Sequence, residues 1–329
     1  MADVTDGDRG QLILVTALAM ATLFVVLSLL VNTTIYTGNV ATRSDVSEST
    51  AVVNYRTEAV VAAERTVAHV NRHDNDSSAV GVDGAYRALN ESLRRGVANW
   101  SDDAAAHGAL SGTGTETRVV TVRNGSRVAQ TDAARALSSP GGATEWTAVT
   151  GATGVRGPTM NLSTSALAPV ADDGDDVSQL VADGAFRMNL TETDGENRSL
   201  FVYERNDGNV GVTVREPDGT VRTCRAPDDG RVTLDARAAT LAGESCPALG
   251  AFATTDDPFD VTFVSSNAAA GTYSVAVDRR ADSGAFPSLS RDAGTPFYTA
   301  AVYTADVTVI YRSPQTHYNA TVEVPNAGA

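Results

Sequence analysis

Residues 186–224 read FRMNLTETDGENRSLFVYERNDGNVGVTVREPDGTVRTC, and this stretch decides the fold of the larger part of the chain. Short apolar runs alternate with three turn sequences, which are Asp194-Gly195, Asn206-Asp207-Gly208 and Pro217-Asp218-Gly219. Asn and Asp hydrogen-bond to their own backbone and Gly tolerates positive φ, so these sequences favour tight turns. They predict antiparallel strands at Phe186–Thr193, Leu200–Arg205, Val210–Arg215 and Val221–Cys224. Strands recurring about every ten residues are typical of a β-sandwich or a curled antiparallel sheet.

Strand patterns continue on both sides of this meander. Further strands are predicted at Phe259–Val264, Thr272–Val277, Phe297–Arg312 and His317–Val324. Upstream, residues 118–123 alternate in polarity and lead into Asn124-Gly125, which is the strongest short hairpin signal. The Gly-, Thr-, Ser- and Ala-rich stretch 138–158 predicts a loop.

The N-terminal part of the chain predicts helices. Residues 12–31, LILVTALAMATLFVVLSLLV, lie in a stretch without charge that runs from Gly10 to Thr42. Twenty helical residues rise about 30 Å, the thickness of a bilayer core, so we expect a transmembrane helix. Residues 41–72 contain no Gly or Pro, so this helix is expected to continue, although a separate soluble helix would fit the same pattern. A second, amphipathic helix is predicted from Gly84 to Trp100.

Together these patterns predict an α+β protein with a long N-terminal helix, transmembrane and then extracellular, followed by a second helix and a mainly antiparallel β head domain. The expected segments are a leader at 1–10, a transmembrane helix at 11–36, a helical stalk at 37–100 and a β-rich head at 101–329.

The residues before the apolar run suggest how the N-terminus is processed. Asp8-Arg9-Gly10-Gln11 resembles the class III signal of archaeal type IV pilin-like proteins. The resemblance implies that a prepilin peptidase cuts between Gly10 and Gln11, with Arg9, Gly10 and Gln11 as the processing site. Many bacterial type IV pilins carry Glu at the fifth mature position, where this chain has Val15. An uncleaved anchor remains an alternative, whereas the acidic start of the chain does not fit a secretory signal peptide.

The charge composition is unusual. The chain has 25 Arg, no Lys, 28 Asp and 12 Glu, which gives a formal net charge of −15. This composition resembles that of proteins from extreme halophiles, especially haloarchaea. The absence of Lys excludes P-loop, Schiff-base and kinase-type lysine chemistry. The negative charge repels phosphate backbones, so no nucleic-acid partner is expected.

The side of the membrane on which the head lies follows from the sequons. Arg9 and Arg43 flank the apolar run, so the positive-inside rule gives no preference. Nine of the 16 Asn residues lie in Asn-x-Ser/Thr, against about three expected by chance. We therefore expect a single-pass protein of the cell membrane with a cytoplasmic N-terminus and a glycosylated extracellular head. Asn32 lies too close to the membrane, and the candidate acceptors are Asn75, Asn90, Asn99, Asn124, Asn161, Asn189, Asn197 and Asn319.

The remaining chemistry-bearing residues are few. Cys224 and Cys246 are expected to form a disulfide, because an extracellular location is oxidising. His69 and His73 have helical spacing but lack the Glu of a metalloprotease motif, which favours a solvated helix end. The acidic loop 172–176 does not have EF-hand spacing. We expect no catalytic residues, no metal site and no cofactor.

The sequence thus favours a membrane-anchored, pilin-like structural or assembly protein of the minor-pilin or pseudopilin type from a halophilic archaeon. Its expected partners are membrane lipid, other pilin-like subunits and a prepilin peptidase. The first alternative is a monomeric cell-surface binding or sensory domain on an uncleaved anchor. The second alternative is an anchored extracellular hydrolase.

Overall fold

A computed structural model describes residues 6–73, 81–171, 176–250, 252, 258–291 and 295–325, except for the side chains of 6–15, 19, 29–48, 157 and 325. The chain forms two compact units, one within residues 1–57 and the other within 58–329. Asn75 and most of the predicted acidic loop, 172–175, lie outside the described residues.

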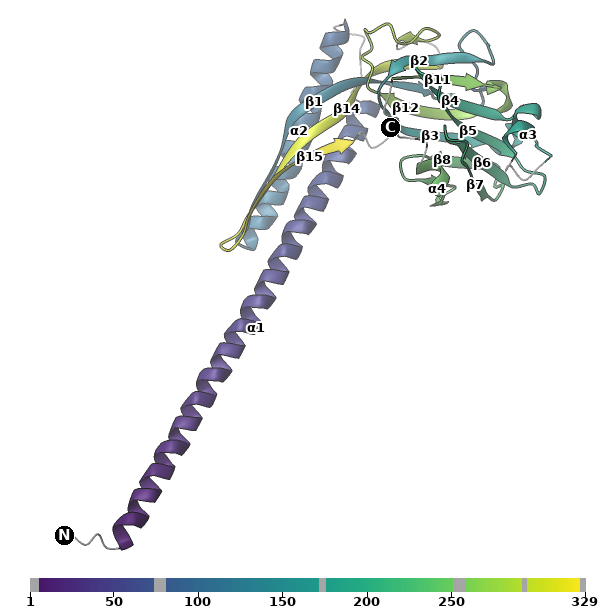
Figure 1. Ribbon diagram of the computed structural model, residues 1–329. Helices are drawn as coiled ribbons and strands as arrows, with labels where there is room; N and C mark the ends of the chain where they lie inside the picture. Colours follow the sequence, from purple (N-terminus) through teal and green to yellow (C-terminus); the bar gives the residue numbers. More distant parts are fainter. Residues whose placement is uncertain are drawn as a thin grey trace. The chain divides into compact units, whose positions relative to one another are not determined.

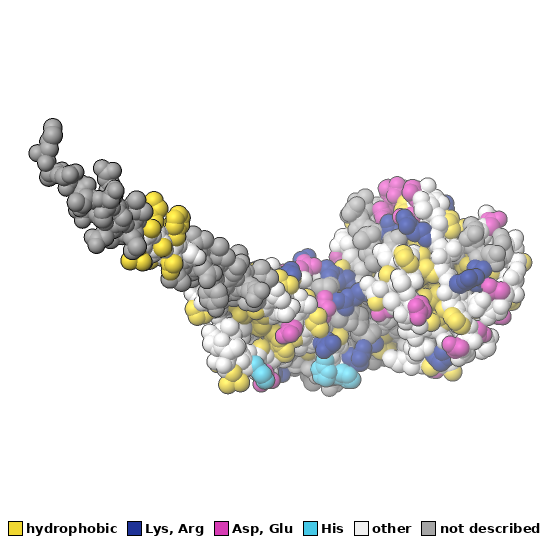
Figure 2. Space-filling view, turned by 90° about the horizontal axis from the view of Figure 1, so that it is seen from below, with side chains coloured by type: hydrophobic (Ala, Val, Ile, Leu, Met, Phe, Trp, Pro, Cys, Tyr) yellow, Lys and Arg dark blue, Asp and Glu magenta, His cyan; other side chains and the backbone are white. Residues whose placement is uncertain are grey.

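The first unit consists of helix α1, which runs without a break from Asp6 to His73 and therefore continues into the second unit. On the face drawn in Figure 2 its described apolar side chains form a band. Each of Leu18, Met20, Leu23 and Phe24 is more than half exposed. Over the side chains that the structure describes, no helix reaches the length and hydropathy that a membrane span requires.

The second unit is built around two β-sheets packed face to face (Figure 1). The nine-stranded sheet has the order β10 (Glu244–Ser245), β9 (Thr240–Leu241), β8 (Arg231–Asp235), β3 (Val155–Ser163), β12 (Gly271–Val277), β1 (Gly114–Gln130), β14 (Phe297–Arg312) and β13 (Ser290–Arg291), with β15 (His317–Pro325) also paired to β14. The six-stranded sheet has the order β2 (Trp146–Ala152), β11 (Phe259–Val264), β4 (Phe186–Glu192), β5 (Asn197–Glu204), β6 (Val210–Arg215) and β7 (Val221–Ala226). Among the described strands the pairings are antiparallel except that of β13 with β14, and an isolated parallel bridge joins Pro169 to Glu204.

The predicted meander is confirmed as β4 to β7, which pair in sequence order. Alternate residues of its strands face the other sheet and form one core with it. The rings of Trp146 and Phe263 stack at 4.8 Å in this core, and Phe186 and Tyr273 lie against Phe263. The short helix α3 (Val177–Ala182) covers Phe201 on the opposite face of the six-stranded sheet. The α+β class and the sandwich alternative are therefore confirmed.

The predicted disulfide is confirmed and joins the two sheets. Cys224 lies on β7, the edge of the six-stranded sheet, and Cys246 follows β10, the edge strand of the nine-stranded sheet. Cys246 is fully buried beside the short helix α4 (Pro247–Gly250). A loop of this length closed by a disulfide stabilises a fold by about 3 kcal/mol in the chain-entropy model.

Two helical segments contact the long β1–β14 pair within the second unit, α2 by packing and α1 through Asn71. Helix α2 (Gly81–Leu110) buries Leu89, Leu93 and Val97 on one face and packs against both strands. The last turns of α1 bury Ala59, Ala63, Val67 and Val70. Spacings of four, four and three residues place these side chains on a single helix face.

Polar side chains from the helices form hydrogen bonds with the backbone near the two register shifts between β1 and β14. Near one register shift, buried Asn71 of α1 accepts a hydrogen bond from Val302 N–H at 2.7 Å and donates one to Val302 C=O at 2.9 Å. Near the other, Arg94 of α2 donates to the carbonyls of Val119 and Val120. Backbone groups released by each bulge thus regain partners, as buried polar groups require.

The structure corrects three sequence predictions. The second helix extends ten residues beyond Trp100, because the alanines after Asp103 favour helix, and the chain leaves it before Gly112, which has φ of +75°. The predicted 138–158 loop contains β2 and the start of β3, whose apolar side chains join the core.

The third correction concerns Asn124-Gly125, which forms no hairpin and lies inside β1. Glycine at position 125 lets the backbone of β1 lie close to Val277 and Tyr303. A Cβ there would collide with the Val277 carbonyl oxygen and with Tyr303. Its own carbonyl accepts a hydrogen bond from the Tyr86 hydroxyl of α2 at 2.8 Å. Tertiary packing therefore overrides the local turn preference.

Candidate functional site

The outer face of the nine-stranded sheet carries a row of polar side chains across four strands. The register pairs Asn161 of β3 with Thr272 of β12 and with Thr233 of β8, so the three side chains share one face. Thr159 and Ser274 are paired in the same way. The alternate residues Met160, Tyr273 and Val275 belong to the buried core.

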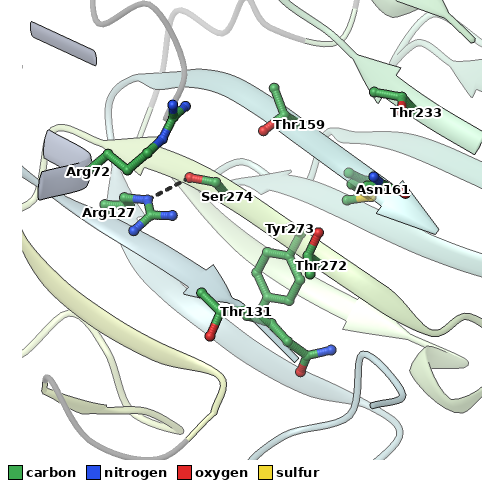
Figure 3. A pocket seen from close by; sticks show the side chains of 11 residues that line it. Arg72, Arg127, Thr131, Thr159, Asn161, Thr233, Thr272, Tyr273 and Ser274 are labelled. Carbon is green, nitrogen blue, oxygen red and sulfur yellow. Dashed lines mark hydrogen bonds between the residues drawn. The ribbon is translucent and has the colours of Figure 1, made fainter. Parts of the chain in front are cut away.

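This face contains a groove of about 370 Å³, here named the Arg127 groove. Arg127 comes from β1, and Arg72 comes from the C-terminal turn of α1, within the second unit. Figure 3 shows the Arg72 and Arg127 side chains at one end of the groove, with hydroxyl and amide side chains spread along the strands beyond them. Its full lining is Arg72, Arg127, Gln130, Thr131, Thr159, Met160, Asn161, Thr233, Thr272, Tyr273 and Ser274.

The charges at this end of the groove are not balanced. Arg127 is half-buried and donates from Nε to Ser274 Oγ at 2.9 Å. Burial, and then the positive charge of Arg72, lower the pKa of Arg127 from its ordinary value. Among the residues that the structure describes, no carboxylate forms an ion pair with either guanidinium.

Asn161 is held in a defined orientation at the other end. Arg231 donates from Nε to Asn161 Oδ1 at 2.8 Å and from Nη2 to the Asn161 carbonyl at 2.9 Å. With Oδ1 occupied, the amide nitrogen is the atom of this exposed side chain that is left for a ligand or a glycan.

A second groove of about 360 Å³ lies at the β1–β14–β15 side of the sheet and is named the Arg156 groove. Glu323 of β15 pairs with both Arg123 and Arg156, the latter at 2.6 Å. The Arg156 guanidinium also lies 4.8 Å from the centre of the Tyr303 ring. Burial is the main cause that raises the pKa of Tyr303. The remaining lining residues are Asn124, Thr153 and Asp278.

Among the residues that the structure describes, acidic and histidine side chains form no comparable site. Glu192, Asp194 and Glu196 bring carboxylate oxygens within 4.8 Å of one another at the β4–β5 turn. Asp194 there accepts the Glu196 N–H, a turn interaction. Asp176, at the end of the predicted acidic loop, caps α3 through the N–H groups of Ser178 and Gln179.

The two predicted helix-end histidines are both exposed. The rings of His69 and His73 lie 4.8 Å apart. Within the described part of the chain, no third potential metal ligand joins them.

The sequon residues differ in accessibility. Asn99, Asn161 and Asn319 are exposed, whereas Asn90, Asn124 and Asn197 are half-buried. Asn189, on β4, is buried, so its side chain does not present the amide nitrogen for modification in the folded state. The processing residues Arg9, Gly10 and Gln11 lie on the helical backbone near the start of α1, and their side chains are outside the described set.

Comparison with known proteins gives no match, either to a protein-family model or to a curated protein. Sequence reasoning did not identify the two grooves. Their residues come from strands and a helix far apart in the chain, and the only local signal is a polar residue at alternate positions, as in Thr159 and Asn161.

Proposed function

We propose that this protein is a membrane-anchored, extracellular pilin-like subunit of the minor-pilin or pseudopilin type, from a halophilic archaeon. The N-terminal helix would remain in the membrane after removal of residues 1–10 and would pack there against lipid and against other such helices. The β-rich head would lie outside the cell.

The observation that carries this proposal is the continuity of α1. One helix contains both the charge-free run 12–31 and Asn71, which is hydrogen-bonded to β14. In pilin-like proteins one N-terminal helix likewise supplies both the membrane anchor and a part of the head, and this likeness supports the proposal.

Three features support an extracellular head. The disulfide between Cys224 and Cys246 is typical of oxidising compartments. Sequons lie at exposed positions on α2, β3 and β15. Arginine and acidic side chains are interspersed on the face drawn in Figure 2, as suits a surface that must stay hydrated in salt.

The deciding experiment is the sequence of the mature N-terminus in a haloarchaeal host. We expect it to begin at Gln11 in the wild type and at the original N-terminus in Gly10→Val, because a peptidase that cuts after a small residue would reject Val. Gly7→Val is the matched control, three residues upstream, and should be processed normally. A wild-type mature protein that retains Met1 would contradict the proposal.

A second measurement tests assembly. A single cysteine at Phe24, in the exposed apolar band, is expected to cross-link to the same residue of a neighbouring subunit in membranes. Cysteine at Arg118, on the exposed surface of β1, is the control. A chain that keeps Met1 and gives no cross-link would be a monomeric surface binding domain, the alternative that the Arg127 groove favours.

A further inference from the structure

The Arg127 groove has the composition of a binding site for a negatively charged ligand. Arginine guanidinium groups recognise carboxylates through paired N–H donors. Here Arg127 uses only Nε, on Ser274, among its described neighbours, so both Nη groups remain available. Arg72 is exposed at the rim of the same groove.

The charge environment of this pair differs from that of the arginines that pair with carboxylates within the described part of the fold. The chain has 40 acidic residues for 25 arginines, and other arginines near the sheet, such as Arg156 and Arg280, pair with carboxylates. Two adjacent like charges disfavour each other, and burial of Arg127 adds to this cost. A bound anion between the two guanidinium groups would remove both penalties.

The rest of the groove indicates what else the ligand carries. Thr159, Thr233, Thr272 and the Asn161 amide extend away from the arginines along the sheet (Figure 3). Hydroxyl groups can both donate and accept hydrogen bonds, which matches the hydroxyls of a sugar ring. The groove volume of about 370 Å³ is within the range of small-molecule sites, about 300–1,000 Å³.

We propose that the Arg127 groove binds an acidic saccharide, with the sugar carboxylate between Arg72 and Arg127 and the sugar hydroxyls on the Thr and Asn side chains. This inference does not depend on the membrane anchor or on subunit assembly. The saccharide could be a separate surface polysaccharide or a glycan carried by the chain's own Asn161, and both sources share the same chemistry.

The test is calorimetric titration of the full-length protein in detergent, made in a host without N-glycosylation, with trigalacturonate as the probe. We expect binding to the wild type and at least tenfold weaker binding to Arg72→Gln and to Arg127→Gln. Arg118→Gln, also on β1, is the matched control and should bind normally. The same trisaccharide with its carboxylates reduced to alcohols should not bind.

The variant at Arg72 keeps the test decisive even if Arg127→Gln folds poorly, because Arg72 is an exposed residue at a helix end. Failure of the wild type to bind trigalacturonate would overturn the proposal. Equal binding by wild type and Arg72→Gln, or binding of the reduced trisaccharide, would overturn it as well.

A second arm distinguishes the two sources of the sugar. Protein from a glycosylating haloarchaeal host is titrated beside its Ser163→Ala variant, which removes the sequon but keeps Asn161, and Asn161 is examined by mass spectrometry. Weaker binding to the glycosylated wild type, restored in Ser163→Ala, would identify the chain's own glycan as the occupant. Equal binding by both proteins would assign the groove to a separate polysaccharide.

Discussion

The two arginine grooves use the same strand but differ in charge balance. Strand β1 supplies Arg123 to the Arg156 groove and Arg127 to the Arg127 groove, four residues apart. In the Arg156 groove the C-terminal strand brings Glu323 to both guanidinium groups. In the Arg127 groove the second arginine comes from α1, and no described carboxylate accompanies it.

The difference indicates two roles for arginine. In the Arg156 groove the arginines stabilise the fold, and in the Arg127 groove we assign them to ligand binding. In the Arg156 groove, each guanidinium has a carboxylate within the fold, and Arg156 also lies over Tyr303, so the interactions join β1, β3, β14 and β15. In the Arg127 groove no described carboxylate pairs with Arg72 or Arg127, and we assign their positive charge to the binding of the proposed acidic ligand. Four substitutions test this distinction, given from the largest expected effect to the smallest.

Gly125→Ala should disrupt both grooves at once. Gly125 lies between the two arginines on β1, and a Cβ there would meet the Val277 carbonyl oxygen and Tyr303. Backbone cannot move aside as a side chain can, so we expect a loss of about 3 kcal/mol or more in the free energy of unfolding. Denaturant unfolding of the full chain in detergent measures it.

Gly114→Ala is the matched control on the same strand, since its added Cβ would meet only Arg312 Cβ at 3.9 Å. A Gly125→Ala protein as stable as Gly114→Ala would refute the close approach of β1 to β12.

Asn71→Ala should affect the Arg127 groove more than the Arg156 groove. The change leaves the buried N–H and C=O of Val302 without their Asn71 partner, at a cost of about 2–3 kcal/mol. It also loosens the helix turn that positions Arg72. We expect lower stability together with weaker trigalacturonate binding, measured by unfolding and titration at a temperature where the variant is folded.

The specificity of the Asn71 effect can be examined with Asn71→Asp. This side chain can still accept from Val302 N–H, but an ionised carboxylate would be buried against the Val302 carbonyl oxygen. Asn71→Asp should therefore be no more stable than Asn71→Ala. An Asp variant as stable as wild type would contradict the burial of residue 71 against β14.

Glu323→Gln should make the Arg156 groove resemble the Arg127 groove. The ion pairs are partly exposed, so we expect only about 0.5–1 kcal/mol of lost stability. The freed arginines should give a second trigalacturonate site, detected as a change in stoichiometry from one to about two. Unchanged stoichiometry would indicate that hydroxyl side chains, and not charge alone, define the Arg127 groove.

Arg72→Gln should slightly stabilise the protein without ligand. Removing one of two neighbouring positive charges relieves a repulsion of about 0.3 kcal/mol, an effect that salt screens. Thermal unfolding at low and high KCl measures it, and the difference from wild type should shrink as salt rises. A lower melting temperature in Arg72→Gln at low salt would argue against repulsion between the two arginines.

The regions that sequence predicted well are those in which local chemistry decides the structure. The turn sequences at 194–195, 206–208 and 217–219 gave β4 to β7, and the predicted 259–264 and 297–312 strands match β11 and β14. The Cys224–Cys246 disulfide follows from the sequence because two cysteines allow only one intramolecular pairing.

Prediction failed where a distant part of the chain outweighed a local preference. The Asn124-Gly125 sequence favours a turn, but β12, β14 and Tyr86 of α2 hold it within a long strand. The two grooves were missed for the same reason, since Arg72 and Arg127 are 55 positions apart and only packing of α1 beside the sheet brings them together.

By itself the sequence determined the positions of most strands, the disulfide partners and the charge-free N-terminal run, because turn residues, cysteines and charges act over short range. Only the tertiary structure decided which arginines meet a carboxylate. Strand register places Glu323 beside Arg123 and Arg156, whereas Arg72 and Arg127 line one groove with no ion-paired carboxylate among the described residues. No local pattern encodes those long-range distances.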